Sequence, residues 1–255
     1  MTIPMSGGQA AVAALETEDV SHVFGLIGSA TMEMFDALYD SPIKMIGVHD
    51  ERTGTHMADG FARASGKAGV VLAGQNGPGA TNLVTGLSQA KAAFSPVVSI
   101  AGMLAQGHIY RDAFQEVDQQ SLFTPVTKKT WTAPSADRVP ELFREAFRTA
   151  LSPRQGPVQL NLPRDVLAAQ ADFPAMQPPM GYRNQSVPAA QADDVKTAAK
   201  MLSGATRPVI VAGGGIKNTR GHDAAIALAE ALNCPIVTIP AHGYAISRAL
   251  PLIHI

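Results

Sequence analysis

Short apolar runs alternate along the chain with longer stretches whose apolar residues recur at helical spacing, and glycine or proline marks most of the joins. The alternation predicts strands over 22–27, 43–48, 69–73, 97–101 and 158–162. It predicts helices over 31–39, 51–65, 80–93 and 139–151, and a first helix capped by Ser6 that runs to about residue 18. We therefore expect an α/β fold: a doubly wound, mainly parallel sheet with helices on both faces.

The pattern changes after residue 162. Residues 163–190 carry five prolines and little periodicity, which is typical of a linker. A helix from about residue 192, a strand over 209–212, the glycines 213–215, a further helix and a strand over 236–239 follow. We expect a first domain over 1–165, a linker over 166–190 and a truncated, Rossmann-like second domain over 191–255, because its few units cannot close a two-sided sheet.

Composition narrows the class of protein. The net charge of −1 gives no electrostatic reason to expect binding to nucleic acid or to an anionic membrane surface. The single cysteine, Cys234, precludes an internal disulfide and suits a reducing compartment. The first residues show no basic cluster followed by an apolar run, so we expect a cytoplasmic protein with no membrane partner.

Ligands of parallel sheets bind at the carboxyl ends of the strands, and three candidates lie there. Glu51 opens a helix, whose dipole favours a carboxylate; a solvated glutamate of the first turn is the alternative. The turn 74–79 has three glycines that permit close approach of backbone to a ligand, although packing alone also produces such turns. Gln115 offers an amide that both donates and accepts hydrogen bonds; the alternative is a solvated loop residue.

Five short motifs then occur in order. They are Val23-Phe24-Gly25, His49-Asp50-Glu51, the run from His56 to Arg63, the run from Gly77 to Asn82, and the run from Asp112 to Glu116. Together they resemble the N-terminal, pyrimidine-binding domain of the acetolactate synthase-like enzymes, which depend on thiamine diphosphate (ThDP). The resemblance covers roughly residues 5 to 165, so coincidence is a poor explanation for it.

The resemblance implies an activity and its residues. The enzyme would be a ThDP-dependent 2-oxo-acid carboligase or acetyltransferase, in which Glu51 hydrogen-bonds N1′ of the aminopyrimidine and so activates the cofactor to the ylide. Gln115 would be the second catalytic residue, directed toward the bound intermediate or the acceptor aldehyde. Seven residues are implied as cofactor contacts: Gly28, Ser29, Glu51, Gln75, Asn76, Gly77 and Asn82.

The resemblance also implies partners. The Gly-Asp-Gly motif that holds Mg²⁺ and the diphosphate in the family does not occur, so we expect no metal ligand in this chain. A homodimer or tetramer, or a separate diphosphate-binding chain, would then complete the site for a small 2-oxo acid. Residues 207–209 and 213–215 resemble the start of the family's central domain, which in some relatives holds an FAD without a redox role.

Other interpretations stay open. Residues 27–30, 74–76 and 114–119 are closer to sulfoacetaldehyde acetyltransferase, whereas 125–128 suit acetolactate synthases. No adjacent histidine pair occurs around 106–108, which argues against simple decarboxylation. A second alternative is an interaction protein without catalytic activity. The joint presence of Glu51, Asn76 and Gln115 argues against it. A plain nucleotide-binding protein is the weakest alternative. The glycine turn at 213–215 is not followed by the last glycine of the dinucleotide-binding motif, and no acidic partner follows the next strand.

Overall fold

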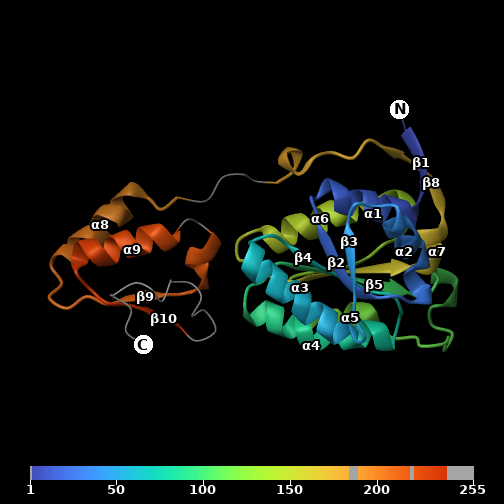
Figure 1. Cartoon of the computed structure of the whole chain (residues 1–255), viewed down its shortest axis with the longest axis horizontal. Coiled ribbons are helices and arrows are strands. Elements are labelled where there is room, and N and C mark those ends of the chain that lie inside the picture. Colours follow the sequence, from blue (N-terminus) through green and yellow to red (C-terminus); the bar gives the residue numbers. More distant parts are fainter. Residues whose placement is uncertain (1, 184–188, 219–220, 240–255) are drawn as a thin grey trace. The chain divides into compact units, whose positions relative to one another are not determined.

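The computed structural model describes residues 2–183, 189–218 and 221–239. The chain divides into two compact units, Met1–Arg183 and Asn184–Ile255 (Figure 1). Among the described residues, no helix combines the length and the apolar content needed to cross a membrane.

A six-stranded parallel sheet forms the centre of the first unit, with strand order β3-β2-β4-β5-β7-β6. The strands are β2 (His22–Leu26), β3 (Lys44–Gly47), β4 (Gly69–Ala73), β5 (Val97–Met103), β6 (Thr130–Thr132) and β7 (Val158–Pro163). Every residue of β4 is buried, which explains its uninterrupted apolar sequence. The expected doubly wound parallel fold is therefore confirmed.

Helices cover both faces of this sheet (Figure 1). One face packs against α1 (Gly7–Thr17), α2 (Met32–Tyr39), α6 (Val139–Leu151) and α7 (Arg164–Ala168). The other packs against α3 (Glu51–Ser65), α4 (Pro78–Ala92) and α5 (Gln119–Phe123). Successive residues of β4 alternate between the two cores, with Val70 and Leu72 in one and Val71 and Ala73 in the other, as the pleat requires. Short 3₁₀ turns lie at Ser29–Thr31, Gln106–His108, Thr124–Val126, Ala136–Arg138 and Pro179–Gly181.

The start of α1 is as the sequence predicts. The Ser6 hydroxyl accepts a hydrogen bond from the backbone N–H of Gln9 at 3.1 Å, and the Gln9 side chain accepts one from the Ser6 N–H at 2.8 Å. This reciprocal capping box satisfies two backbone donors that the helix itself leaves without acceptors.

The structure differs from the sequence pattern in the segment expected to be a linker, 166–190. Helix α7 extends into it, and β8 (Gln170–Pro174) pairs antiparallel with β1 (Thr2–Ser6). Further along, the Tyr182 hydroxyl and the Arg183 guanidinium bind the buried carboxylate of Glu18. All of these contacts join residues far apart in sequence, so no local periodicity announces them.

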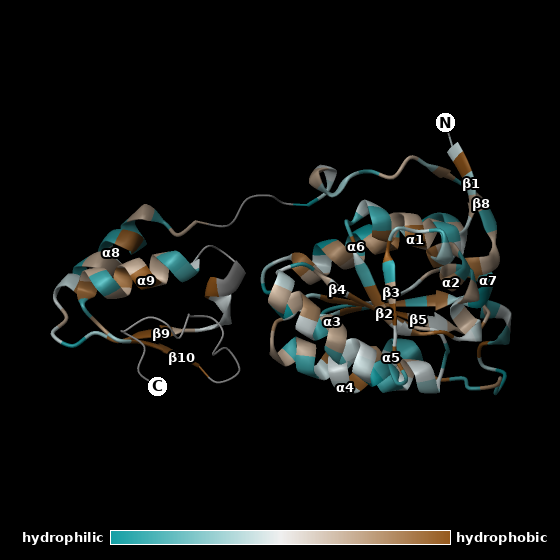
Figure 2. Cartoon of the chain, in the orientation of Figure 1, coloured by the Kyte–Doolittle hydropathy of each residue, from teal (hydrophilic) through white to brown (hydrophobic). Residues whose placement is uncertain are grey.

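The second unit contains α8 (Ala192–Ser203), β9 (Ile210–Ala212), a 3₁₀ turn at Gly214–Asn218, α9 (Gly221–Leu232) and β10 (Ile236–Thr238). Strands β9 and β10 pair in parallel. Figure 2 shows hydrophobic residues concentrated in the central strands of the first unit and in β9 and β10 of the second. Cys234 is buried in the small core of this unit.

Helices α3 and α4 approach one another closely at Gly86. A Cβ on Gly86 would lie 2.5 Å from the Cβ of Thr55, a buried residue of α3. Only a residue without a side chain fits at that point of α4, so this glycine fixes the separation of the two helices.

We expect Gly86→Ala to lower the free energy of unfolding of the first unit by about 1–3 kcal/mol, because the added methyl overpacks the α3–α4 contact. The matched control is Gly60→Ala in α3, where a Cβ meets open space. That control should raise the stability by about 0.5–1 kcal/mol through helix propensity alone. Urea unfolding followed by the fluorescence of Trp131, the single tryptophan, measures both variants. Equal effects of the two substitutions would contradict the proposed crowding.

Candidate functional site

The candidate site lies where the strand order reverses. Strand β2 pairs with β3 on one side and with β4 on the other, and such a switch point is where ligands of doubly wound sheets bind. Beyond the ends of β2 and β4 the two backbones touch: the Ala30 N–H donates to the Gly74 carbonyl at 2.9 Å. A Cβ on Gly28 would lie 2.6 Å from that same carbonyl oxygen, so Gly28 has a packing role in this chain.

Four of the predicted site residues form one hydrogen-bonded network at this edge. The Ser29 hydroxyl donates to Oε1 of Gln75 at 3.0 Å, and Nε2 of Gln75 donates to Oε1 of Gln115 at 2.7 Å. The Asn76 amide donates to the backbone carbonyls of Gln115 at 3.0 Å and of Phe114 at 3.2 Å. The turn after β4 therefore holds the loop that carries Gln115.

Gly77 packs closely against this loop. Its φ is +52°, and Gln115 itself has a φ of +61°. A Cβ on Gly77 would lie 2.4 Å from the Gln115 carbonyl oxygen. Both the backbone conformation and the contact therefore demand glycine at position 77.

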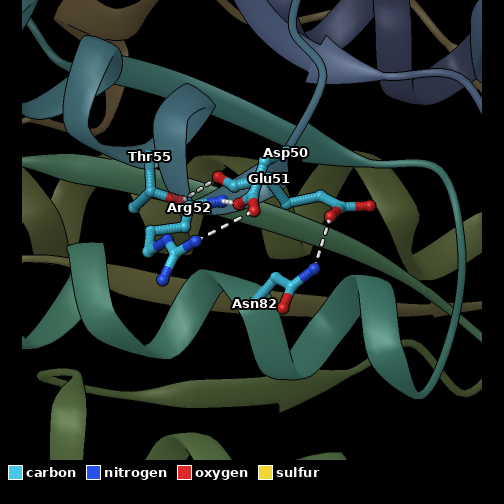
Figure 3. Close-up of polar contacts among 5 residues, drawn as sticks. All are labelled: Asp50, Glu51, Arg52, Thr55 and Asn82. Atoms are coloured by element: carbon cyan, nitrogen blue, oxygen red, sulfur yellow. Dashed lines mark hydrogen bonds and ion pairs between the residues drawn. The ribbon is translucent and has the colours of Figure 1, made fainter.

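Glu51 lies at the first turn of α3, behind the N-cap Asp50, which accepts a hydrogen bond from the Arg52 N–H at 2.8 Å. Figure 3 shows the Glu51 side chain turned away from the Asp50–Arg52 ion pair and toward α4. The residue is only 5% exposed, and Nδ2 of Asn82 donates to its Oε2 at 3.0 Å. No hydrogen bond from the described residues reaches Oε1.

Gly79 links Glu51 to the amide network, although the sequence analysis did not single it out. A Cβ on Gly79 would stand 3.1 Å from Oε1 of Glu51 and 3.1 Å from Cβ of Gln75. The sequence signal for Gly79 is its three-residue spacing from Asn82, which places both residues on one face of α4. The absence of a side chain at Gly79 therefore leaves Oε1 of Glu51 uncrowded on that side.

The loop after β5 folds around its own carboxylates. Glu116 accepts hydrogen bonds from the backbone N–H groups of Tyr110 and Ala113, which lower the pKa of that carboxyl. Asp118 caps α5, and hydrogen bonds from Ser121 lower the pKa of its carboxyl. A pocket of about 450 Å³ adjoins this loop, with Asn76 and Gln115 in its wall. Nowhere in the described ranges do three or more His, Cys, Asp or Glu side chains gather in a group suited to a metal ion.

The arrangement combines two chemical elements. A buried carboxyl has one oxygen to which no described residue donates, and a side chain at Gly79 would crowd that oxygen. A cluster of amides lies next to it and presents Gln115 to the pocket. Such a carboxyl suits a hydrogen bond to a ring nitrogen of a planar heterocycle, and the amides suit a carbonyl or hydroxyl group of a substrate.

Comparison with known proteins identifies both units. Residues 5–122 match the model described as thiamine pyrophosphate enzyme, N-terminal TPP binding domain. Residues 195–253 match the model described as thiamine pyrophosphate enzyme, central domain. The two matches together cover more than half of the chain.

Curated relatives agree with these matches. The chain is 41% identical over 239 residues to a probable acetolactate synthase large subunit of Methanocaldococcus jannaschii, which covers 92% of this chain and 40% of the relative. It is 38% identical over 253 residues to a protein of the same description from Methanococcus aeolicus, which covers 97% of this chain and 42% of the relative. It is 37% identical over 238 residues to an acetolactate synthase large subunit of Corynebacterium glutamicum, which covers 92% of this chain and 37% of the relative. The chain thus spans about two fifths of the length of these relatives.

We expect Gly77→Ala to destabilise the first unit by more than about 2 kcal/mol, since it combines backbone strain with a clash against Gln115. It should also expose the loop 109–116 to limited proteolysis. Gly66→Ala is the matched control: Gly66 has a φ of +74°, but a Cβ there meets open space. The control should cost only about 1 kcal/mol of strain and leave the loop protected. A loop equally protected in both variants would contradict the interlock between Gly77 and Gln115.

Proposed function

Because this chain belongs to the thiamine pyrophosphate enzymes, we propose that it supplies the aminopyrimidine-binding half of a ThDP site in an acetolactate synthase-like carboligase. The observation that carries the proposal is the environment of Glu51. Its carboxyl is buried, has one oxygen without a donor among the described residues, and borders the space kept free by Gly79. This is the geometry that a hydrogen bond to N1′ of the aminopyrimidine requires.

When bound, ThDP supplies a thiazolium carbon that adds to the 2-oxo acid. Its ring takes up the electron pair that stays behind when the carboxylate leaves as carbon dioxide. In the proposal Glu51 shares a proton with the pyrimidine at Oε1. Burial of the carboxyl excludes water from that exchange and so favours proton transfer between the two partners. Gly77 and Asn76 border the pyrimidine, and Gly28 and Ser29 face the reacting carbon from the end of β2.

Gln115 is assigned to the second substrate. Its amide oxygen is held by Gln75, so the orientation of the amide group is fixed before substrate binds. The side chain also lies in the wall of the pocket that the β5 loop borders. We propose that Gln115 hydrogen-bonds the acceptor carbonyl as the new carbon–carbon bond forms.

We further propose that Mg²⁺ and the diphosphate are held outside the described residues of this chain. The partner would be a second copy in a homodimer or tetramer, or a separate diphosphate-binding chain. FAD is the ligand that the resemblance implies for the unit matched by the central-domain model.

Two substrate classes are compatible with the site. The relatives named above are acetolactate synthases, which favours carboligation between two 2-oxo acids. Residues 27–30, Ile-Gly-Ser-Ala, instead resemble sulfoacetaldehyde acetyltransferase, which acts on a sulfonated aldehyde. Identification of the product formed from a 2-oxo acid alone distinguishes the two activities, because only carboligation proceeds without the sulfonated substrate.

We expect Glu51→Gln to slow hydrogen–deuterium exchange at the thiazolium C2 by about 10²-fold or more, because the amide cannot take part in proton transfer. The exchange is measured by NMR in a complex of this chain with a diphosphate-binding chain, ThDP and Mg²⁺. Glu141→Gln on α6, beyond the opposite face of the sheet, is the control and should leave the rate unchanged. Exchange at the wild-type rate in correctly folded Glu51→Gln would exclude the proposed function.

Gln115→Ala should lower kcat/KM for the acceptor by about tenfold or more, since it removes hydrogen bonds to a polar substrate group. Exchange at C2 should change by less than about twofold, because the amide acts after that step. Gln106→Ala, in the same loop but bonded to the Pro134 carbonyl, serves as the control. Unchanged acceptor kinetics in Gln115→Ala would contradict the assignment.

A further inference from the structure

Asn82 points at the central carboxyl of the site from the neighbouring helix. Figure 3 shows its side chain rising from α4 to Glu51. Its Nδ2 lies 3.0 Å from Oε2 of Glu51. Asn82 is itself exposed, whereas Glu51 is buried, so the contact is made at the edge of the buried carboxyl.

The contact is set by helix packing. Gly79, Asn82 and Gly86 are spaced by three and four residues, so they share one face of α4. On α3 the opposing residues are Glu51 and Thr55, again four apart. Gly86 against Thr55 fixes the distance between the helices, and Asn82 then meets Glu51 on the same seam. The loop residues of the site do not contribute to this contact.

The two oxygens of Glu51 are therefore not equivalent. Oε2 accepts the Asn82 amide hydrogen, whereas Oε1 borders the space at Gly79. A carboxylate that accepts a hydrogen bond at one oxygen can no longer turn freely about its last bond, and its other oxygen stays directed at the ligand.

We propose that Asn82 is a positioning residue that holds Oε2 of Glu51 and thereby reserves Oε1 for proton exchange with the ligand. This inference rests on the proposed function and deepens it. The family resemblance placed Asn82 among the cofactor contacts, whereas the geometry gives it a role that acts through Glu51.

The first test needs no cofactor. In the ¹⁵N-labelled chain, Glu51→Gln should shift a side-chain N–H resonance of Asn82, because a charge-assisted hydrogen bond is replaced by a neutral one. Glu141→Gln is the control: it makes the same change of functional group on α6, on the opposite face of the sheet, and should leave the Asn82 resonance in place. Resonances that do not respond to Glu51→Gln would overturn the proposal at the level of the contact.

The second test uses the complex with ThDP and Mg²⁺. Asn82→Leu should slow C2 exchange by about tenfold or more, as expected for loss of a hydrogen bond to a charged group, and should change ThDP affinity by less than about threefold. In the Glu51→Gln background the same substitution should have no further effect, because the group that it positions is gone. Glu141→Gln on α6 should leave the exchange rate unchanged.

Three outcomes would overturn the positioning role. The first is unchanged exchange in Asn82→Leu, and the second is an equal loss in both backgrounds. The third is a loss of ThDP affinity that matches the loss of exchange, which would indicate direct contact with the cofactor. If C2 exchange in the wild-type complex did not depend on Glu51, the proposed function would fail, and the positioning role would fail with it even if the resonance test had confirmed the contact.

Discussion

The close approach of α3 and α4 at Gly86 and Thr55 is the constraint on which the site depends. It brings the first turn of α3 against the first two turns of α4, and so buries the carboxyl of Glu51 where none of the described basic side chains pairs with it. A buried carboxyl with no hydrogen bond would cost several kcal/mol, and the amide of Asn82 offsets part of this cost. The helix packing thus buries the carboxyl of Glu51 and supplies a hydrogen bond to it in the same contact.

The site consists of a rigid half and a half held by loops. Glu51, Gly79 and Asn82 lie on packed helices, where neighbouring turns restrict their movement. Gln75, Asn76 and Gln115 lie on connections, and they are held to each other by amide hydrogen bonds. This division agrees with the proposed function, in which proton transfer depends on the packed helices and the second substrate on amides that hydrogen bonds hold in place. It also explains why positive φ angles occur at Gly77 and Gln115, where loop and turn interlock.

The sequence predicts what depends on local periodicity and capping. Five of the six strands of the sheet, the cap at Ser6 and the placement of Glu51 at a helix start follow from residues close to one another in sequence. It does not predict β6, which is three residues long, or β8, whose partner β1 lies at the other end of the unit. The contacts of Gln75 with Gln115 and of Asn82 with Glu51 join residues 40 and 31 positions apart. Only the family resemblance grouped these residues, and it gave no indication of which of them touch.

The pairing of β1 with β8 has a consequence for synthesis on the ribosome. Strand β1 is synthesised about 170 residues before its partner residues, Gln170 to Pro174. At 5–20 residues per second, this delay is roughly 8–35 s. During that time β1 is an unpaired strand with open hydrogen-bonding groups, the kind of edge that invites association with other chains. The proline at position 4, which has no backbone N–H to donate, makes it a poor template for such association.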